Sequence, residues 1–121
     1  MNSALLLVAL LQAKHFLADF LFQSDWQVRN KGSYGHPAGL VHAGQHALLT
    51  VPCLLVVGVT PALAAAAAAA EFLIHYHQDW TKEWLGRQLS ATPDRKIFWV
   101  VLGGDQLLHQ MAYLGMAFLL L

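Results

Sequence analysis

Charged side chains are scarce in this sequence of 121 residues. Asp, Glu, Lys and Arg together make up 12% of the chain, about half the share found in an ordinary soluble domain. The seven basic and seven acidic side chains cancel, so a basic surface for nucleic acid is not expected. A short chain also has a large surface for its volume, and here the polar cover that water requires is missing. The composition therefore predicts that lipid meets much of the surface.

Cysteine is nearly absent as well. Cys53 is the single cysteine, which excludes an internal disulfide and any cysteine-based zinc motif. The N-terminal segment lacks the basic region of a signal peptide, so we expect it to remain as a membrane helix.

Hydrophobic residues fill the space that charge leaves, at 57% of the chain. They form four segments, at about residues 3–30, 38–59, 61–86 and 94–121, each long enough to cross roughly 30 Å of hydrocarbon. Thr-Pro pairs at Thr60 and Thr92 are typical of helix starts. We therefore predict an all-α fold in which residues 1–121 form a single integral membrane domain, a four-transmembrane-helix bundle. The alternative is a soluble bundle of buried helices.

The basic residues indicate an orientation in the membrane. They gather in two connecting segments, whereas the turn between the second and third helices has none. By the positive-inside rule, both basic segments are cytoplasmic and both termini lie outside. The residues are Arg29 and Lys31 in the first segment, and Lys82, Arg87, Arg95 and Lys96 in the last.

Seven histidines stand out in such an apolar chain. Every predicted helix carries one pair of His or Asp residues four positions apart, a spacing that places both side chains on one helix face. Such inward-facing pairs build metal sites in helical bundles, and imidazole and carboxylate are ligands for zinc, iron and manganese. The proposed ligands are His15, Asp19, His42, His46, His75, Asp79, Asp105 and His109. This set suits one or two divalent transition-metal ions. Zinc is the expected metal, and iron and manganese are the alternatives.

All four pairs fall in the cytoplasmic half of the predicted membrane domain, as one shared centre requires. Unpaired charges at that depth would cost several kcal/mol each. A proton or ion relay and a purely structural polar core remain as alternatives.

Further polar residues lie beside the pairs. Glu71, one turn before His75, is the candidate general base or a hydrogen-bonded partner of the ligands, and Gln23 and Gln106 could orient ligands or substrate. Lys14 is expected to point away from the His15–Asp19 face, toward the membrane interface or another subunit. His36 and His77 receive no assigned role.

Several motifs resemble a known family. The stretches "KHFLADFLFQSDW", "YGHPAGLVHAGQHALLT", "EFLIHYHQDWTK" and "GGDQLLHQ" are similar to the small bacterial inner-membrane family catalogued as domain of unknown function 3307. More distantly, they resemble the membrane-bound metal-dependent hydrolases. The resemblance implies a multi-pass protein of the bacterial inner membrane with a polar His/Asp centre, and it supplies no substrate.

The function predicted from these features is metal-dependent hydrolysis within the membrane. The alternative is a metal or proton carrier, or a di-iron redox protein without hydrolytic activity. The expected partners are the lipid bilayer and a lipid-linked or amphipathic substrate, with no nucleic acid. Whether the protein forms a homo-oligomer is left open by the sequence.

Overall fold

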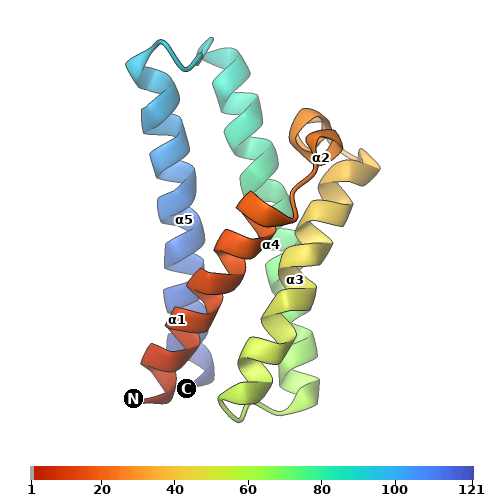
Figure 1. The fold of residues 1–121 in the computed structure, drawn as a ribbon, viewed down its shortest axis with the longest axis vertical. Helices are drawn as coiled ribbons and strands as arrows, with labels where there is room; N and C mark the ends of the chain where they lie inside the picture. The colour runs from red at the N-terminus through yellow and green to blue at the C-terminus, as the bar shows by residue number, and fades with distance from the viewer. Residues whose placement is uncertain (1) are drawn as a thin grey trace.

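The computed structural model describes residues 2–121, and every regular element in that range is helical. The elements are α1 (Ser3–Phe16), the π-helical turn η1 (Leu17–Leu21), α2 (Asp25–Asn30), α3 (Pro37–Val56), α4 (Pro61–Gln88) and α5 (Lys96–Leu120). Helices α1, α3, α4 and α5 are long, and α2 is short (Figure 1). The predicted all-α fold is confirmed.

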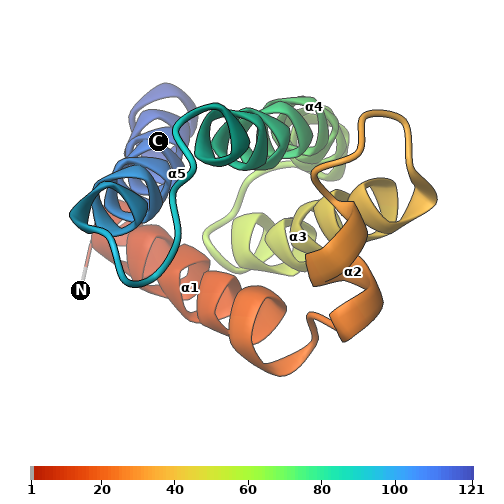
Figure 2. The same cartoon turned by 90° about the horizontal axis from the view of Figure 1, so that it is seen from above.

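The four long helices surround a common axis. Helix α1 contacts α3 and α5, and α4 contacts the same two helices from the other side, so the contacts close into a ring (Figure 2). Figure 1 shows both termini at one end of the bundle, with α2 and the α4–α5 connection at the other end. Each long helix therefore has one face toward the interior.

Local sequence signals fix several helix ends. Thr60 caps α4 by accepting a hydrogen bond from the Leu63 N–H, and Pro61 is the first helical residue, as predicted. Gly58, with φ +89°, supplies the left-handed conformation that turns the chain from α3 into α4. Helix α3 consequently ends at Val56, three residues before the predicted end.

The first predicted helix, residues 3–30, is divided in the structure. The helical run from α1 through η1 ends at Leu21, and Ser24 then caps α2 by accepting a hydrogen bond from the Gln27 N–H. Serine competes for backbone hydrogen bonds and favours a new helix start over continuation of the old one. The break turns α2 against α3.

The apolar core occupies the half of the bundle that holds the termini. Its buried side chains come from all four long helices and the α3–α4 turn. They are Leu7, Leu11, Cys53, Leu54, Val59, Ala64, Tyr113 and Ala117. In the other half of the bundle, toward α2 and the α4–α5 connection, the interior is lined by polar side chains.

Two segments within residues 2–121 are long and apolar enough, by length and composition alone, to span a membrane. They are Ser3–Leu21 and Pro37–Val56. The prediction of four such helices is therefore supported only for these two. Helices α4 and α5 are long enough, but runs such as "HYHQDW" and "GGDQLLHQ" lower their hydropathy near the middle.

Candidate metal centre

The four predicted pairs meet inside the bundle. Each long helix buries a stripe of residues three or four positions apart, and the His and Asp side chains lie on these stripes. Seven of the eight proposed ligands are buried, and the Asp19 side chain is 14% exposed.

Asp19 is the first of two carboxylates that gather imidazoles. Its Oδ1 lies 2.8 Å from His46 Nε2 and 3.2 Å from His42 Nε2, and its Oδ2 lies 3.0 Å from His15 Nε2. These histidines come from α1 and α3, so Asp19 joins two neighbouring helices.

Asp79 plays the same part on the other side of the axis. Its Oδ2 lies 3.2 Å from His75 Nε2 and 3.4 Å from His42 Nε2, and its Oδ1 lies 3.2 Å from His109 Nε2. His42 thus stands between Asp19 and Asp79. The two halves form one continuous centre that involves all four long helices.

Two subsets of these side chains have the spacing of metal ligands. One subset is Asp19, His42, His46 and His75, and the other is His75, Asp79 and His109; within each, the ligand atoms all lie within 4.8 Å of one another. Ligand atoms that bind one zinc ion at about 2.0–2.1 Å stand roughly 3.0–3.4 Å apart. The contacts of Asp79, at 3.2–3.4 Å, match that spacing, and those of Asp19 extend from it to the shorter 2.8 Å contact with His46.

Two imidazole nitrogens in the centre lack hydrogen-bond partners among residues 2–121. They are His42 Nε2 and His75 Nε2, both fully enclosed. Carboxylate oxygens lie 3.2–3.4 Å away from each, but not in the direction that a hydrogen bond requires. Buried polar atoms are rarely left in this state, so these nitrogens are suited to a ligand between the carboxylates.

His15 and Asp105 lie at the edge of the centre. His15 Nε2 is 2.9 Å from Gln106 Oε1, and its Nδ1 is 2.8 Å from the Tyr113 hydroxyl. Asp105 Oδ1 is 3.3 Å from His109 Nε2. The use of all eight residues as metal ligands stays a prediction, as does the orienting role of Gln106, which contacts His15.

The π-helical turn η1 presents Asp19 to the centre. The Phe22 N–H donates to the Leu17 carbonyl at 2.9 Å, which closes a turn one residue wider than an α-helical turn. Single π turns inside helices are frequent at functional sites. Here the wide turn carries Asp19, whose carboxylate contacts His15 of α1 as well as His42 and His46 of α3.

Outer hydrogen bonds hold two members of the centre. Gln27 Oε1 lies 3.3 Å from His42 Nδ1, and the Gln23 side-chain amide donates to the Asp19 carbonyl at 2.9 Å. A metal-binding histidine commonly donates its second ring N–H in this manner. Gln23 contacts only the backbone of Asp19, so its predicted role in orienting ligands or substrate stays a prediction.

Lys14 does not point away from the centre, and that prediction is wrong. Its side chain is buried and forms an ion pair with Glu71. Its Nζ also lies 3.3 Å from both His46 Nδ1 and the His46 carbonyl. The buried stripe of α1 is wide enough to include Lys14 as well as His15.

Glu71 has two partners beside the centre. One carboxylate oxygen faces Lys14, and the other accepts a hydrogen bond from the Thr50 hydroxyl. Its assignment as a general base stays a prediction, because a base needs an oxygen that substrate or water can reach.

The sequence-based reasoning missed four polar residues around the centre. Spacing could have found two: Thr50 follows His46 by four positions, and Tyr113 follows His109 by four. Gln27 and Lys31 come from the segment around α2, where periodicity gives no signal.

His36 and His77 lie outside the centre. His36 caps α3, with its Nδ1 accepting a hydrogen bond from the Ala38 N–H at 3.0 Å. His77 is exposed on α4 and contacts the Tyr34 hydroxyl through Nε2 at 2.9 Å.

Comparison with known proteins identifies a family without a known function. The model of the family described as protein of unknown function (DUF3307) matches residues 6–120, so the chain belongs to it and the resemblance to this family is confirmed. Neither a curated protein nor a solved structure matches the chain.

Proposed function

We propose that this member of the DUF3307 family is a membrane-embedded, metal-dependent hydrolase. The convergence of His and Asp side chains from four helices carries the proposal. Two enclosed imidazole nitrogens without hydrogen-bond partners in the described chain support it. A bound divalent ion would supply a water of lowered pKa and would polarise the bond to be cleaved.

The centre suits one or two ions. His75 belongs to both ligand subsets, and a single Nε2 serves one ion. If His75 binds with Asp79 and His109, then Asp19, His42 and His46 remain for a second ion. If only one ion binds, the remaining side chains become its hydrogen-bonded surroundings.

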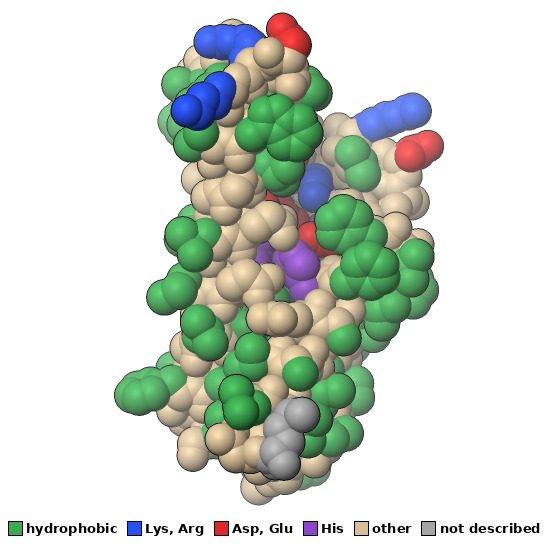
Figure 3. All heavy atoms as spheres, turned by 60° about the vertical axis from the view of Figure 1, so that its left-hand side comes forward, with side chains coloured by type: hydrophobic (Ala, Val, Ile, Leu, Met, Phe, Trp, Pro, Cys, Tyr) green, Lys and Arg blue, Asp and Glu red, His purple; other side chains and the backbone are tan. Residues whose placement is uncertain are grey.

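The interior below the centre favours a hydrolase over a carrier. A carrier needs a polar path to both faces, but the apolar core cluster fills the bundle between the centre and the termini. The outer side is open: Figure 3 shows His and acidic side chains at the bottom of a hollow on the surface. An enzyme needs access from one side only.

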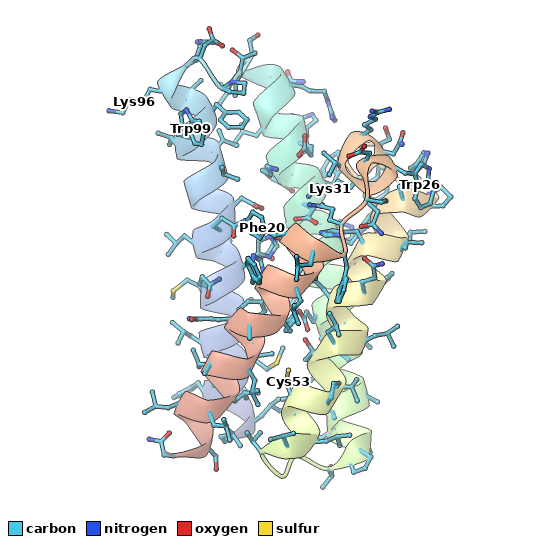
Figure 4. All side chains as sticks on the ribbon, viewed as in Figure 1. Phe20, Trp26, Lys31, Cys53, Lys96 and Trp99 are labelled. Carbon is cyan, nitrogen blue, oxygen red and sulfur yellow. The ribbon has the colours of Figure 1, made fainter. Side chains whose placement is uncertain are left out.

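The distribution of side chains supports insertion in a membrane. On the face in Figure 3, the protruding charged side chains lie at the end with α2 and the α4–α5 connection, the other acidic side chains lie in the hollow, and hydrophobic side chains are spread over the rest of the face. Large apolar side chains such as Leu48, Phe118 and Leu119 are 74–86% exposed. Trp26 and Trp99 lie toward the charged end (Figure 4), as interface aromatics do.

Cysteine labelling tests this orientation. A cysteine placed at Ser33 or Ser90, at the charged end, is expected to react only from the cytoplasmic side, and one at Thr60 only from outside. The labelling uses whole cells and a thiol reagent that does not cross membranes, with the buried Cys53 replaced beforehand. Labelling of all three positions from the same side would contradict a membrane-spanning bundle.

Hydrolysis is tested directly with purified protein. Zinc-loaded wild type in detergent is expected to cleave at least one of a panel of phosphoester and carboxylic ester substrates. Asp79→Asn keeps the shape of the side chain but loses the charge that three imidazoles share, so we expect turnover to fall by about 100-fold or more. No turnover by the wild type, with spectra of a redox-active di-iron centre, would favour the redox alternative instead.

A further inference from the structure

Three lysines are buried or half-buried, and they differ in how their charge is balanced. Lys14 pairs with Glu71, and Lys82 Nζ lies 2.9 Å from Glu83 Oε1. Lys31 has no carboxylate within ion-pair distance among residues 2–121. Its one side-chain hydrogen bond there is to a neutral amide, with Nζ donating to Gln23 Oε1 at 2.8 Å.

The burial of Lys31 makes this imbalance costly. The residue is 8% exposed, and a buried ammonium group without a counter-charge is unfavourable unless something offsets it. Of its three N–H donors, two remain for another ligand.

Two glycines hold Lys31 in this position. A Cβ on Gly39 would lie 3.4 Å from the Lys31 Cα, so the start of α3 packs directly on this backbone. A Cβ on Gly32 would lie 2.8 Å from Glu83 and Arg87 of α4, and Arg87 also donates to the Gly32 carbonyl at 3.1 Å. The segment is thus fixed between α3 and α4. Figure 4 shows the Lys31 side chain directed into the space between α4 and the end of η1.

A hollow on the surface leads toward the metal centre. Figure 3 shows a basic side chain near its opening, above the His and acidic side chains. Gln23 links the two levels, because it accepts from Lys31 and donates to the Asp19 backbone. Through Gln23, the Lys31 ammonium group is therefore only two hydrogen bonds away from the backbone of Asp19.

We propose that Lys31 is the anion-binding residue of this site and that the substrate carries a phosphate group. One phosphate oxygen would bind at the metal centre and another would accept hydrogen bonds from the Lys31 ammonium group. Lysine is a common point-charge partner for phosphate. A phosphate dianion could interact with the metal ion and with the Lys31 ammonium group at the same time. A neutral ester would leave Lys31 uncompensated. This inference rests on the proposed metal centre.

Phosphate binding to metal-loaded protein tests the inference. Inorganic phosphate is titrated into zinc-loaded wild type and Lys31→Met in detergent, by calorimetry, with zinc content measured on the same samples. The variant is expected to keep its zinc, because it removes a nearby positive charge, and to bind phosphate roughly ten- to hundredfold more weakly. Lys31→Arg keeps the charge and should retain most of the affinity.

Lys96→Met is the matched control, because Lys96 is an exposed lysine at the same end of the molecule and its loss should leave phosphate affinity unchanged. Repeating the titration with dioctanoyl phosphatidic acid separates two sources of the phosphate group: tighter binding of the lipid assigns a lipid phosphate, and equal binding a water-soluble one.

Three results would overturn the inference while the metal centre stands. These are zinc-loaded wild type that does not bind phosphate, equal phosphate affinity in wild type and Lys31→Met, or acetate that binds as tightly as phosphate. A wild type that binds no metal would overturn the proposed function, and this inference with it.

Discussion

Purified protein is expected to carry about one to two transition-metal ions per chain, and the His42→Ala/His46→Ala variant to lose at least one. The double substitution removes two of four side chains from one ligand subset. The pair of residues left, Asp19 and His75, is too small a set for a tight zinc site. Metal analysis of protein purified in detergent without added metal measures this directly.

Thermal unfolding gives a second measurement of the same centre. A ligand at about 100 times its Kd stabilises the folded state by about 2.7 kcal/mol, so zinc should raise the Tm of wild type and a chelator should lower it. His77→Ala is the matched control, since His77 lies on α4 outside the centre and should keep full metal content. Metal-free wild type whose Tm does not respond to zinc would contradict the metal centre.

The part of this centre that could be predicted from the sequence is the part that follows helical periodicity. Residues four apart share a helix face, so His15–Asp19, His42–His46, His75–Asp79 and Asp105–His109 could be recognised as pairs from the sequence alone. Scarcity of charge indicated that such pairs would gather in the interior. The structure brings all four pairs together because the helices close into a ring.

The remaining parts of the site depend on features without a sequence period. The π turn that carries Asp19 arises from one additional residue per turn, which a pattern of apolar residues does not reveal. Gln27 reaches His42, and Lys31 reaches Gln23, only because Ser24 starts a new helix and the chain then packs on Gly39. Lys31 is consequently a buried site residue, although its charge alone had suggested a loop at the membrane surface.

Lys14 shows a further limit of face-by-face reasoning. Lys14 and His15 are adjacent in α1, about 100° apart around the helix, yet both are buried. A helix packed between two neighbours buries a broad stripe, and a sequence cannot say how broad. The partner that makes Lys14 tolerable, Glu71, is 57 positions away, so local spacing gives no hint of the pair.

Breaking the Lys14–Glu71 pair is expected to destabilise the fold strongly. Both side chains are at most 5% exposed, and removing one partner of a buried ion pair leaves the other charge uncompensated, at a cost of about 3–5 kcal/mol. Lys14→Met, Glu71→Met and Glu71→Gln should therefore each lower the free energy of unfolding. The double variant Lys14→Met/Glu71→Met should recover most of the loss, because an apolar pair of similar volume is often tolerated. Unfolding in detergent, followed by circular dichroism, provides the double-mutant cycle.

The more exposed Lys82–Glu83 pair is the control for the buried Lys14–Glu71 pair. Its side chains are 21% and 32% exposed, so Glu83→Gln should lower the free energy of unfolding by less than about 1 kcal/mol.

The variant Glu71→Gln also distinguishes three roles of Glu71. If Glu71 is a general base, Glu71→Gln should keep the stability and metal content of wild type and lose only turnover, since the amide cannot accept the proton. If Glu71 is a ligand, the same substitution should lower metal content. The contacts with Lys14 and Thr50 favour a loss of stability, and a Glu71→Gln variant as stable as wild type would show that the buried pair is not what holds Glu71 in place.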